Sequence, residues 1–190
     1  MGDRGYQQTI FDKDSVAVNI SAAWLNHRFN CNVEYILETC HGRCCEGTGR
    51  IMVSLCQDEE AWHIAQGQRV EGGLLKPRRG KCPYKATVGL CALHGTPNKP
   101  FGCIASPFTL NVHDTLIIRQ RYSRLRCHGT GPPAYESFKA SLDLLFGKAE
   151  ARRIAVMMRK GSGNFTALMR GMEYNKLKYL DSLKPRGKVK

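Results

Sequence analysis

Six of the nine cysteines in this 190-residue chain form one ordered series. A compact cluster comes first and three single cysteines follow at wide spacings: Cys40, Cys44, Cys45, Cys82, Cys91 and Cys103. Thiolates are strong ligands for zinc and for the iron of iron–sulfur clusters. Such sites combine ligands from a local cluster with single ligands from distant positions in the chain. The series therefore predicts a metal centre with thiolate ligands, and it leaves zinc and an iron–sulfur cluster as alternatives.

Four ligands suffice for one zinc ion or one iron–sulfur cluster, so the series holds more candidates than one site needs. Cys44 and Cys45 are neighbours in the chain. Because adjacent side chains diverge, we expect them to take different roles. One would bind the metal, and the other would enter the core or bind a second metal.

The remaining cysteines and the histidines are weaker candidates. We expect Cys56, at the end of an apolar strand-like segment, to pack in the core, while Cys127 with His128 offers further possible ligands. His41 and His94 lie inside the series, where a histidine can ligate or donate a hydrogen bond to sulfur. The chain has no Walker loop, GxGxxG or HExxH motif, so catalytic residues stay unassigned and an enzymatic role stays open.

The order of these motifs resembles a known family. C-x3-CC, C-P, C-x-x-H and K-P-x-x-C, with Pro107 four residues after the last cysteine, resemble the YkgJ-like cysteine-cluster family over residues 40–107. Members are described as zinc- or iron-chelating proteins with a CxxCxxCC start. The resemblance implies cytoplasmic metal or iron–sulfur binding with an unassigned further role. One departure is that Ile36 or Leu37 stands where the fuller motif has its first cysteine.

The net charge of +13 invites a polyanionic partner. Four arginines surround Tyr122, the last residue of an expected extended segment over residues 115–122: Arg119, Arg121, Arg124 and Arg126. Alternate residues of a strand share a face, so Arg119 and Arg121 would lie together and hold phosphates while the tyrosine stacks a base. The alternatives are a solvated surface, or counter-charges for an anionic metal–thiolate centre.

The redox environment expected for the thiols follows from the lack of a secretory signal and of a membrane-spanning apolar run in the sequence. Residues 1–14 are polar, without the apolar core of a secretory signal, and no apolar run reaches the ~20 residues needed to span a bilayer. We therefore expect a cytoplasmic protein, whose thiols stay reduced and available to a metal. No membrane partner is expected.

The helices and strands expected around the cysteines indicate an α+β fold in a single domain, 1–190. A loop-rich cysteine region, 31–113, would be organised by the metal and pack against a helical region, 134–183, followed by a basic tail, 184–190. The shorter expectations are a strand around 16–20, helical turns in 22–29, a strand in 50–55, a helix over 58–66, a turn at 129–133, and three helices beginning near 134, 151 and 164.

Three function classes fit this sequence. The first is a metal-binding protein of otherwise unassigned role. The second is a basic nucleic-acid-binding protein whose metal is structural. The third is a redox or metal-dependent enzyme.

Overall fold

The computed structural model describes residues 14–46 and 53–183. Within these ranges the chain forms a mixed α+β fold with three small sheets, as the sequence predicts at the level of fold class. The largest sheet has the order β6 (Phe108–Leu110), β7 (Thr115–Ile118), β1 (Ser15–Ile20) and β9 (Phe165–Arg170). The two others pair β2 (Arg28–Phe29) with β8 (His128–Pro133), and β3 (Val53–Ser54) with β5 (Leu74–Leu75) and β4 (Val70–Glu71).

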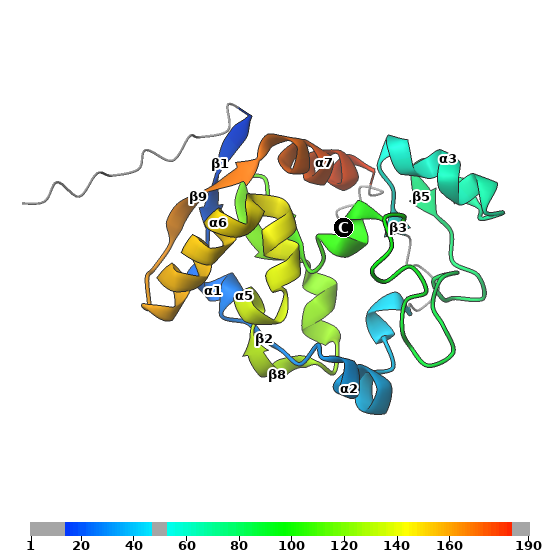
Figure 1. The fold of residues 1–190 in the computed structure, drawn as a ribbon, viewed down its shortest axis with the longest axis horizontal. Helices are drawn as coiled ribbons and strands as arrows, with labels where there is room; N and C mark the ends of the chain where they lie inside the picture. The colour runs from blue at the N-terminus through cyan, green and yellow to red at the C-terminus, as the bar shows by residue number, and fades with distance from the viewer. Residues whose placement is uncertain (1–13, 47–52, 184–190) are drawn as a thin grey trace, which may run out of the picture.

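Strand β1 is the centre of the largest sheet. Its residues alternate between the core and the surface, with Val18 and Ile20 fully buried, as the period-2 pattern predicts. It pairs in parallel with β7 and antiparallel with β9. Figure 1 shows this sheet with α6 (Lys139–Arg159) beside it at one end of the molecule, and α3 (Gln57–Ala65) with the β3–β5 loops at the other.

Two longer helices cover the sheet. Helix α6 packs on β9, and α7 (Gly171–Ser182) contacts β6, β1 and β9. Gly147 has non-helical backbone angles inside α6, which agrees with the predicted helix end at this glycine. The short helices are α1 (Ala22–Leu25), α2 (Val33–Tyr35), α4 (Phe101–Ile104), α5 (Ala134–Ser137), the π-helical turn η1 (Ile36–Cys40), and the 3₁₀ turns η2 (Arg43–Cys45) and η3 (Gln120–Arg124).

Two expectations about the C-terminal region are wrong. The helix expected from Asn164 is strand β9 followed by α7, because Ala167 and Met169 alternate into the core with the period of a strand. The turn expected at 129–133 belongs to strand β8, whose pairing with β2 overrides its glycine and proline content. This region is therefore not purely helical.

Other boundaries shift by a few residues. The strand expected over 50–55 appears as Val53–Ser54, and residues 50–52 lie outside the described ranges, as does the basic tail at 184–190. Helix α3 matches the predicted helix. The extended segment expected over 115–122 ends at Ile118, where β7 gives way to η3.

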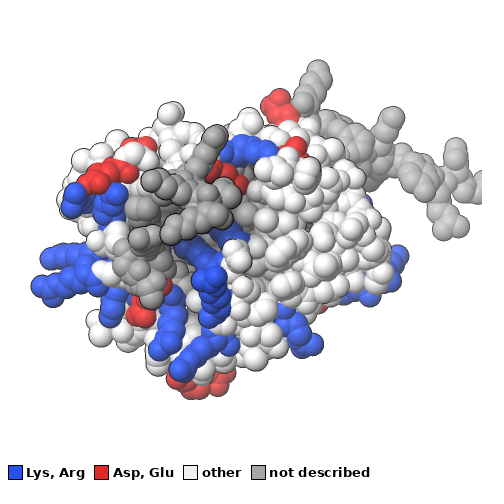
Figure 2. All heavy atoms as spheres, turned by 180° about the vertical axis from the view of Figure 1, so that it is seen from behind, with Lys and Arg blue, Asp and Glu red and all other residues white. Residues whose placement is uncertain are grey.

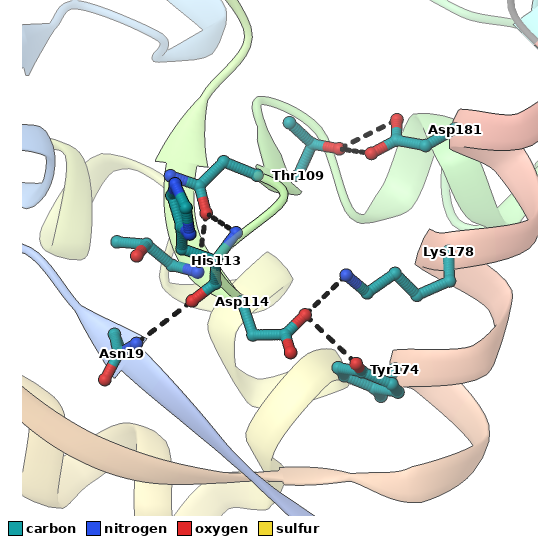
Figure 3. A network of polar contacts seen from close by, with 9 residues as sticks. Asn19, Thr109, His113, Asp114, Tyr174, Lys178 and Asp181 are labelled. Atoms are coloured by element: carbon teal, nitrogen blue, oxygen red, sulfur yellow. Dashed lines mark hydrogen bonds and ion pairs between the residues drawn. The ribbon is translucent and has the colours of Figure 1, made fainter.

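A polar network attaches the β6–β7 turn to α7 (Figure 3). The Asp114 carboxylate accepts a hydrogen bond from the Tyr174 hydroxyl at 3.0 Å and pairs with Lys178. The Thr109 hydroxyl donates to both carboxylate oxygens of Asp181 at 3.1 Å. These contacts fix α7 across the sheet edge.

Among the described residues, no helix has the length and apolar character of a membrane span.

Candidate metal centre

The cluster from Cys40 to Cys45 forms a tight reversal of the chain. Turn η1 ends at Cys40, and His41 and Gly42 then both adopt left-handed backbone angles before η2 begins. Glycine takes these angles without strain, whereas His41 at φ 48° does not. Cys40 is buried, and Cys44 and Cys45 are half-buried.

Backbone hydrogen bonds hold two of the single cysteines against this reversal. The Cys82 N–H donates to the carbonyl of Cys45 at 3.1 Å, and the Lys85 N–H donates to the carbonyl of Cys82 at 3.0 Å. Lys85 also forms an antiparallel bridge with Cys91. The segment from Cys82 to Cys91 therefore packs directly on the end of the cluster.

Cys103 arrives on the short helix α4, which is fixed by contacts at both ends. The Phe101 N–H donates to the Glu59 carboxylate at 2.6 Å, and that carboxylate also accepts the Cys56 N–H at 2.8 Å. At the other end, the Ser141 hydroxyl donates to the carbonyl of Ile104 at 2.7 Å. Helices α3 and α6 thus position the last cysteine of the series.

The thiols of Cys82, Cys91 and Cys103 influence one another's pKa electrostatically. Burial, together with the thiols of Cys82 and Cys91, raises the pKa of Cys103 to about 12. Burial also raises the pKa of Cys82, with Cys91 and Cys44 adding to the shift.

Cys44 and Cys45 differ sharply although they are adjacent. The Cys45 thiol donates a hydrogen bond to Cys44, which lowers the pKa of Cys44 to about 6 with help from Arg121 and against the cost of burial. The same hydrogen bond raises the pKa of Cys45, and burial and the thiols of Cys82 and Cys103 raise it as well. The two neighbours therefore have distinct surroundings.

The thiols are near one another without forming a finished coordination site. In residues 14–46 and 53–183, no three cysteine, histidine, aspartate or glutamate side chains have the arrangement of a metal site. Side-chain rotation or loop closure would have to bring the sulfurs onto a metal. The donor chemistry fits zinc and iron, since thiolate is a preferred ligand of both.

Cys40, the remaining member of the series, acts on two cysteines outside it. It raises the pKa of Cys31 and Cys127, whose main shifts come from burial. Cys56 lies in the hydrophobic core at the start of α3, as the sequence predicts. The chain spacing gave no signal for Cys31, and only the neighbouring His128 drew attention to Cys127.

Two of the four candidate arginines interact electrostatically with the thiols. Arg121 acts on Cys44 and Cys103, and its guanidinium lies 5.1 Å from the centre of the Tyr122 ring. Arg119 acts on Cys103, and its buried Nε has no hydrogen-bond partner among the described residues. The expected strand face shared by Arg119 and Arg121 does not form, because η3 starts at Gln120. These contacts favour a counter-charge role for both side chains.

Arg121 is exposed at the surface, and so are other cations nearby. Arg124 and Arg126 are exposed, as are Arg78, Arg79 and Lys81 beside Cys82. Figure 2 shows lysine and arginine side chains gathered over one half of the face seen from behind, on the side of the cysteine loops. Nucleic-acid binding by the exposed arginines stays a prediction.

The histidines make structural contacts. His63 is buried, and its Nδ1 is hydrogen-bonded to the Tyr84 hydroxyl at 2.8 Å, which ties α3 to the loop after Cys82. His27 Nδ1 and His128 Nε2 share a hydrogen bond of 2.9 Å across β2 and β8, a pair that no spacing in the sequence indicates. His94 is exposed beside Lys99.

Comparison of the chain with family models, curated proteins and solved structures finds no match.

Proposed function

We propose that this protein binds a metal, as zinc or an iron–sulfur cluster, through thiolates of the cysteine series. One observation carries the proposal. Cys45, Cys82, Cys91 and Cys103 come from η2, two loop positions and α4, yet their thiols influence one another electrostatically. Four thiols match the ligand number of both kinds of site.

The surrounding charges support an anionic centre. Four thiolates on a divalent metal carry a net charge of about −2, which needs compensation in a partly buried place. Arg121 and Arg119 interact electrostatically with Cys103, and Lys85 and Lys99 act to lower the pKa of Cys44 and Cys103 respectively. Lys85 is nearly buried and pairs with Glu46 beside the cluster. Cations placed this way stabilise thiolates and favour metal binding.

The loops between β5 and α4 also support the proposal. Between β5 and α4 the chain makes turns and isolated bridges with little regular structure. Bound metal would cross-link this segment and supply folding free energy of order 10 kcal/mol. The resemblance to the YkgJ-like family and a reducing cytoplasmic location are parts of the same proposal.

The test is metal analysis on protein purified without oxygen. We expect stoichiometric metal, with zinc giving a colourless protein and an iron–sulfur cluster giving a brown one with charge-transfer absorption. Cys82→Ser and Cys103→Ser should lose metal, whereas Cys56→Ala removes a core thiol and should keep it. Metal-free protein, or unchanged metal content in the Cys82 and Cys103 variants, would refute the proposal.

A further inference from the structure

A tight hairpin in the loop between β5 and α4 is built from cations. The Arg78 N–H donates to the carbonyl of Lys81 at 2.9 Å, and the Lys81 N–H donates to the carbonyl of Arg78 at 3.1 Å. Arg79 and Gly80 form the tip between them, with φ of 51° and 76°. Two consecutive positive φ angles are typical of a type I′ turn, the common connection of a two-residue hairpin. We name residues 78–81 the basic hairpin.

The first residue of the tip is unusual for this turn. Asparagine, aspartate and glycine are preferred where a type I′ turn requires positive φ, because other side chains there crowd their own backbone. Arg79 places a long, charged side chain at this position. Strained backbone angles of this kind cluster at binding and switch sites, where function retains them.

The two residues that flank the tip also disfavour the hairpin locally. Arg78 and Lys81 form an antiparallel bridge, so they stand opposite each other. Like charges directly opposite each other in such a pair repel. The basic hairpin thus departs from local stability at the tip and at the bridge, and such departures are expected at functional sites.

The charges of the basic hairpin are available to a partner. Arg78, Arg79 and Lys81 are all exposed. In residues 14–46 and 53–183, neither arginine forms an ion pair with a carboxylate. Lys81 lies 3.9 Å from the Glu46 carboxylate, which already pairs with the nearly buried Lys85.

Backbone contacts hold the basic hairpin against the cysteine cluster. Lys81 forms a bridge with Glu46, and the Cys82 N–H donates to the carbonyl of Cys45 at 3.1 Å. Turn η2, which begins at the exposed Arg43, therefore ends beside the hairpin. Figure 2 shows lysine and arginine side chains gathered on the side of the cysteine loops. The hairpin is thus fixed within a cationic face.

We propose that the basic hairpin, with Arg43 beside it, binds the phosphate backbone of a nucleic-acid duplex. Guanidinium groups pair well with phosphate oxygens, and a duplex groove admits a two-stranded ribbon. Residues 76–81 contain no aromatic side chain on which a single strand would stack, and no large apolar side chain that would insert into a lipid surface. These cations differ from the arginines around Tyr122, where the sequence pattern predicts nucleic-acid binding.

Arg79→Asn separates binding from folding. Asparagine suits the left-handed tip, so this variant should unfold at the same urea concentration as the wild type or at a higher one. It removes one cation, so the log–log salt slope of binding to duplex DNA should decrease in magnitude by about 0.9, and adding Arg78→Gln should bring the decrease to about 1.8. Fluorescence anisotropy with labelled duplex DNA and duplex RNA, at about 50 to 200 mM salt, measures the slope. Saturable binding of either duplex with this dependence supports the proposal, and the more tightly bound duplex is the partner.

A matched control removes the same charge elsewhere. Lys148→Gln with Arg152→Gln takes two exposed cations from α6, at the other end of the molecule from the β3–β5 loops (Figure 1), and should leave the slope unchanged. An equal decrease in this control would overturn the proposal, because net charge alone would then explain the binding. The absence of saturable binding of both duplexes at about 150 mM salt would overturn it as well.

Two further measurements complete the test. Tighter binding to phosphatidylserine vesicles than to either duplex would identify a lipid surface as the partner and overturn the proposal. Metal content is determined for every variant, so the two proposals fail separately. Metal-free protein that binds a duplex through the basic hairpin would refute the metal site alone, and metal-loaded protein without duplex binding would refute the basic hairpin surface alone.

Discussion

Gly42 and Gly89 meet backbone to backbone, and a Cβ on Gly42 would lie 1.9 Å from the carbonyl oxygen of Gly89. Both residues have positive φ, at 61° and 89°. The contact presses the turn between Cys40 and Cys44 onto the loop between Cys82 and Cys91. It is a close backbone link between the cluster and the single cysteines, and it requires glycine at both positions.

Gly42→Ala should therefore destabilise the protein and lower its metal content. Overpacking typically costs about 1–3 kcal/mol, beyond the penalty for alanine in a left-handed conformation. Gly72→Ala is the matched control, since Gly72 has φ +56° and a Cβ added there would meet nothing within 4 Å. Urea unfolding of both variants measures the difference. Equal losses of stability would show that the contact with Gly89 relaxes freely.

Metal removal should loosen one part of the molecule selectively. Chelation, or Cys82→Ser, should expose residues 67–107 to limited proteolysis, because a metal cross-link that orders these loops would be lost. Helix α6 lies on the main sheet and should remain protected. Fragment mapping by mass spectrometry gives the sites of cleavage. An unchanged pattern after confirmed metal loss would mean that the loops order themselves.

Glu59→Ala should reduce stability through two backbone groups. The carboxylate accepts the N–H groups of Cys56 and Phe101, and each buried donor left without a partner costs about 1–3 kcal/mol. Glu59→Gln retains one acceptor oxygen and should lose less. Chemical denaturation measures both variants. A gain of stability in both variants, which both remove the charge, would show that burial of the charge, which raises the pKa of Glu59, outweighs the two hydrogen bonds.

Stability should fall on acidification because of His63. Burial lowers the pKa of this histidine below its usual 6.5. The unfolded state therefore binds more protons, and the stability contributed by neutral His63 is lost as pH falls from about 6.5 toward the folded pKa. His63→Asn should show a smaller difference between denaturation at pH 7.5 and pH 5.5. His94→Asn, at an exposed histidine, is the control. Identical pH dependence in wild type and His63→Asn would contradict this assignment.

The arginines around Tyr122 should separate into two kinds. Arg121→Gln should weaken metal binding, because Arg121 interacts electrostatically with Cys44 and Cys103. Arg124→Gln removes an exposed cation nearby and should leave metal affinity unchanged. If Arg124 and Arg126 contact duplex DNA, replacing both should reduce the log–log salt slope by about 1.8 in filter binding. Metal loss in Arg124→Gln equal to that in Arg121→Gln would argue against a specific counter-charge.

Local periodicity predicted the parts of the fold that local contacts decide. The alternation of Val18 and Ile20 identified β1, and Gly147 identified the break in α6. The residues from Phe165 to Arg170 fit both a strand and a helix, and their pairing with β1 decides between the two. Strand β8 carries turn residues and depends on β2 in the same way.

The same distinction applies to the candidate site. Spacing drew attention to Cys82, Cys91 and Cys103 because their motifs are local. Cys31 gave no such signal, since its proximity to Cys127 arises from the pairing of β2 with β8. Sequence alone also placed Arg119 and Arg121 on a strand, whereas the 3₁₀ turn after Ile118 carries Arg121.

The position of β1 has a consequence for synthesis of the chain. It is the first described strand, yet its partner in β7 at Thr115 is 96 positions away, and its partner in β9 at Phe165 pairs with Ile20 across 145 positions. Both edges of β1 therefore stay unpaired until the ribosome has synthesised the later strands β7 and β9. A chain released before residue 165 leaves one edge of this apolar strand without β9. Such an open edge invites pairing with other chains, so truncated products should aggregate rather than fold.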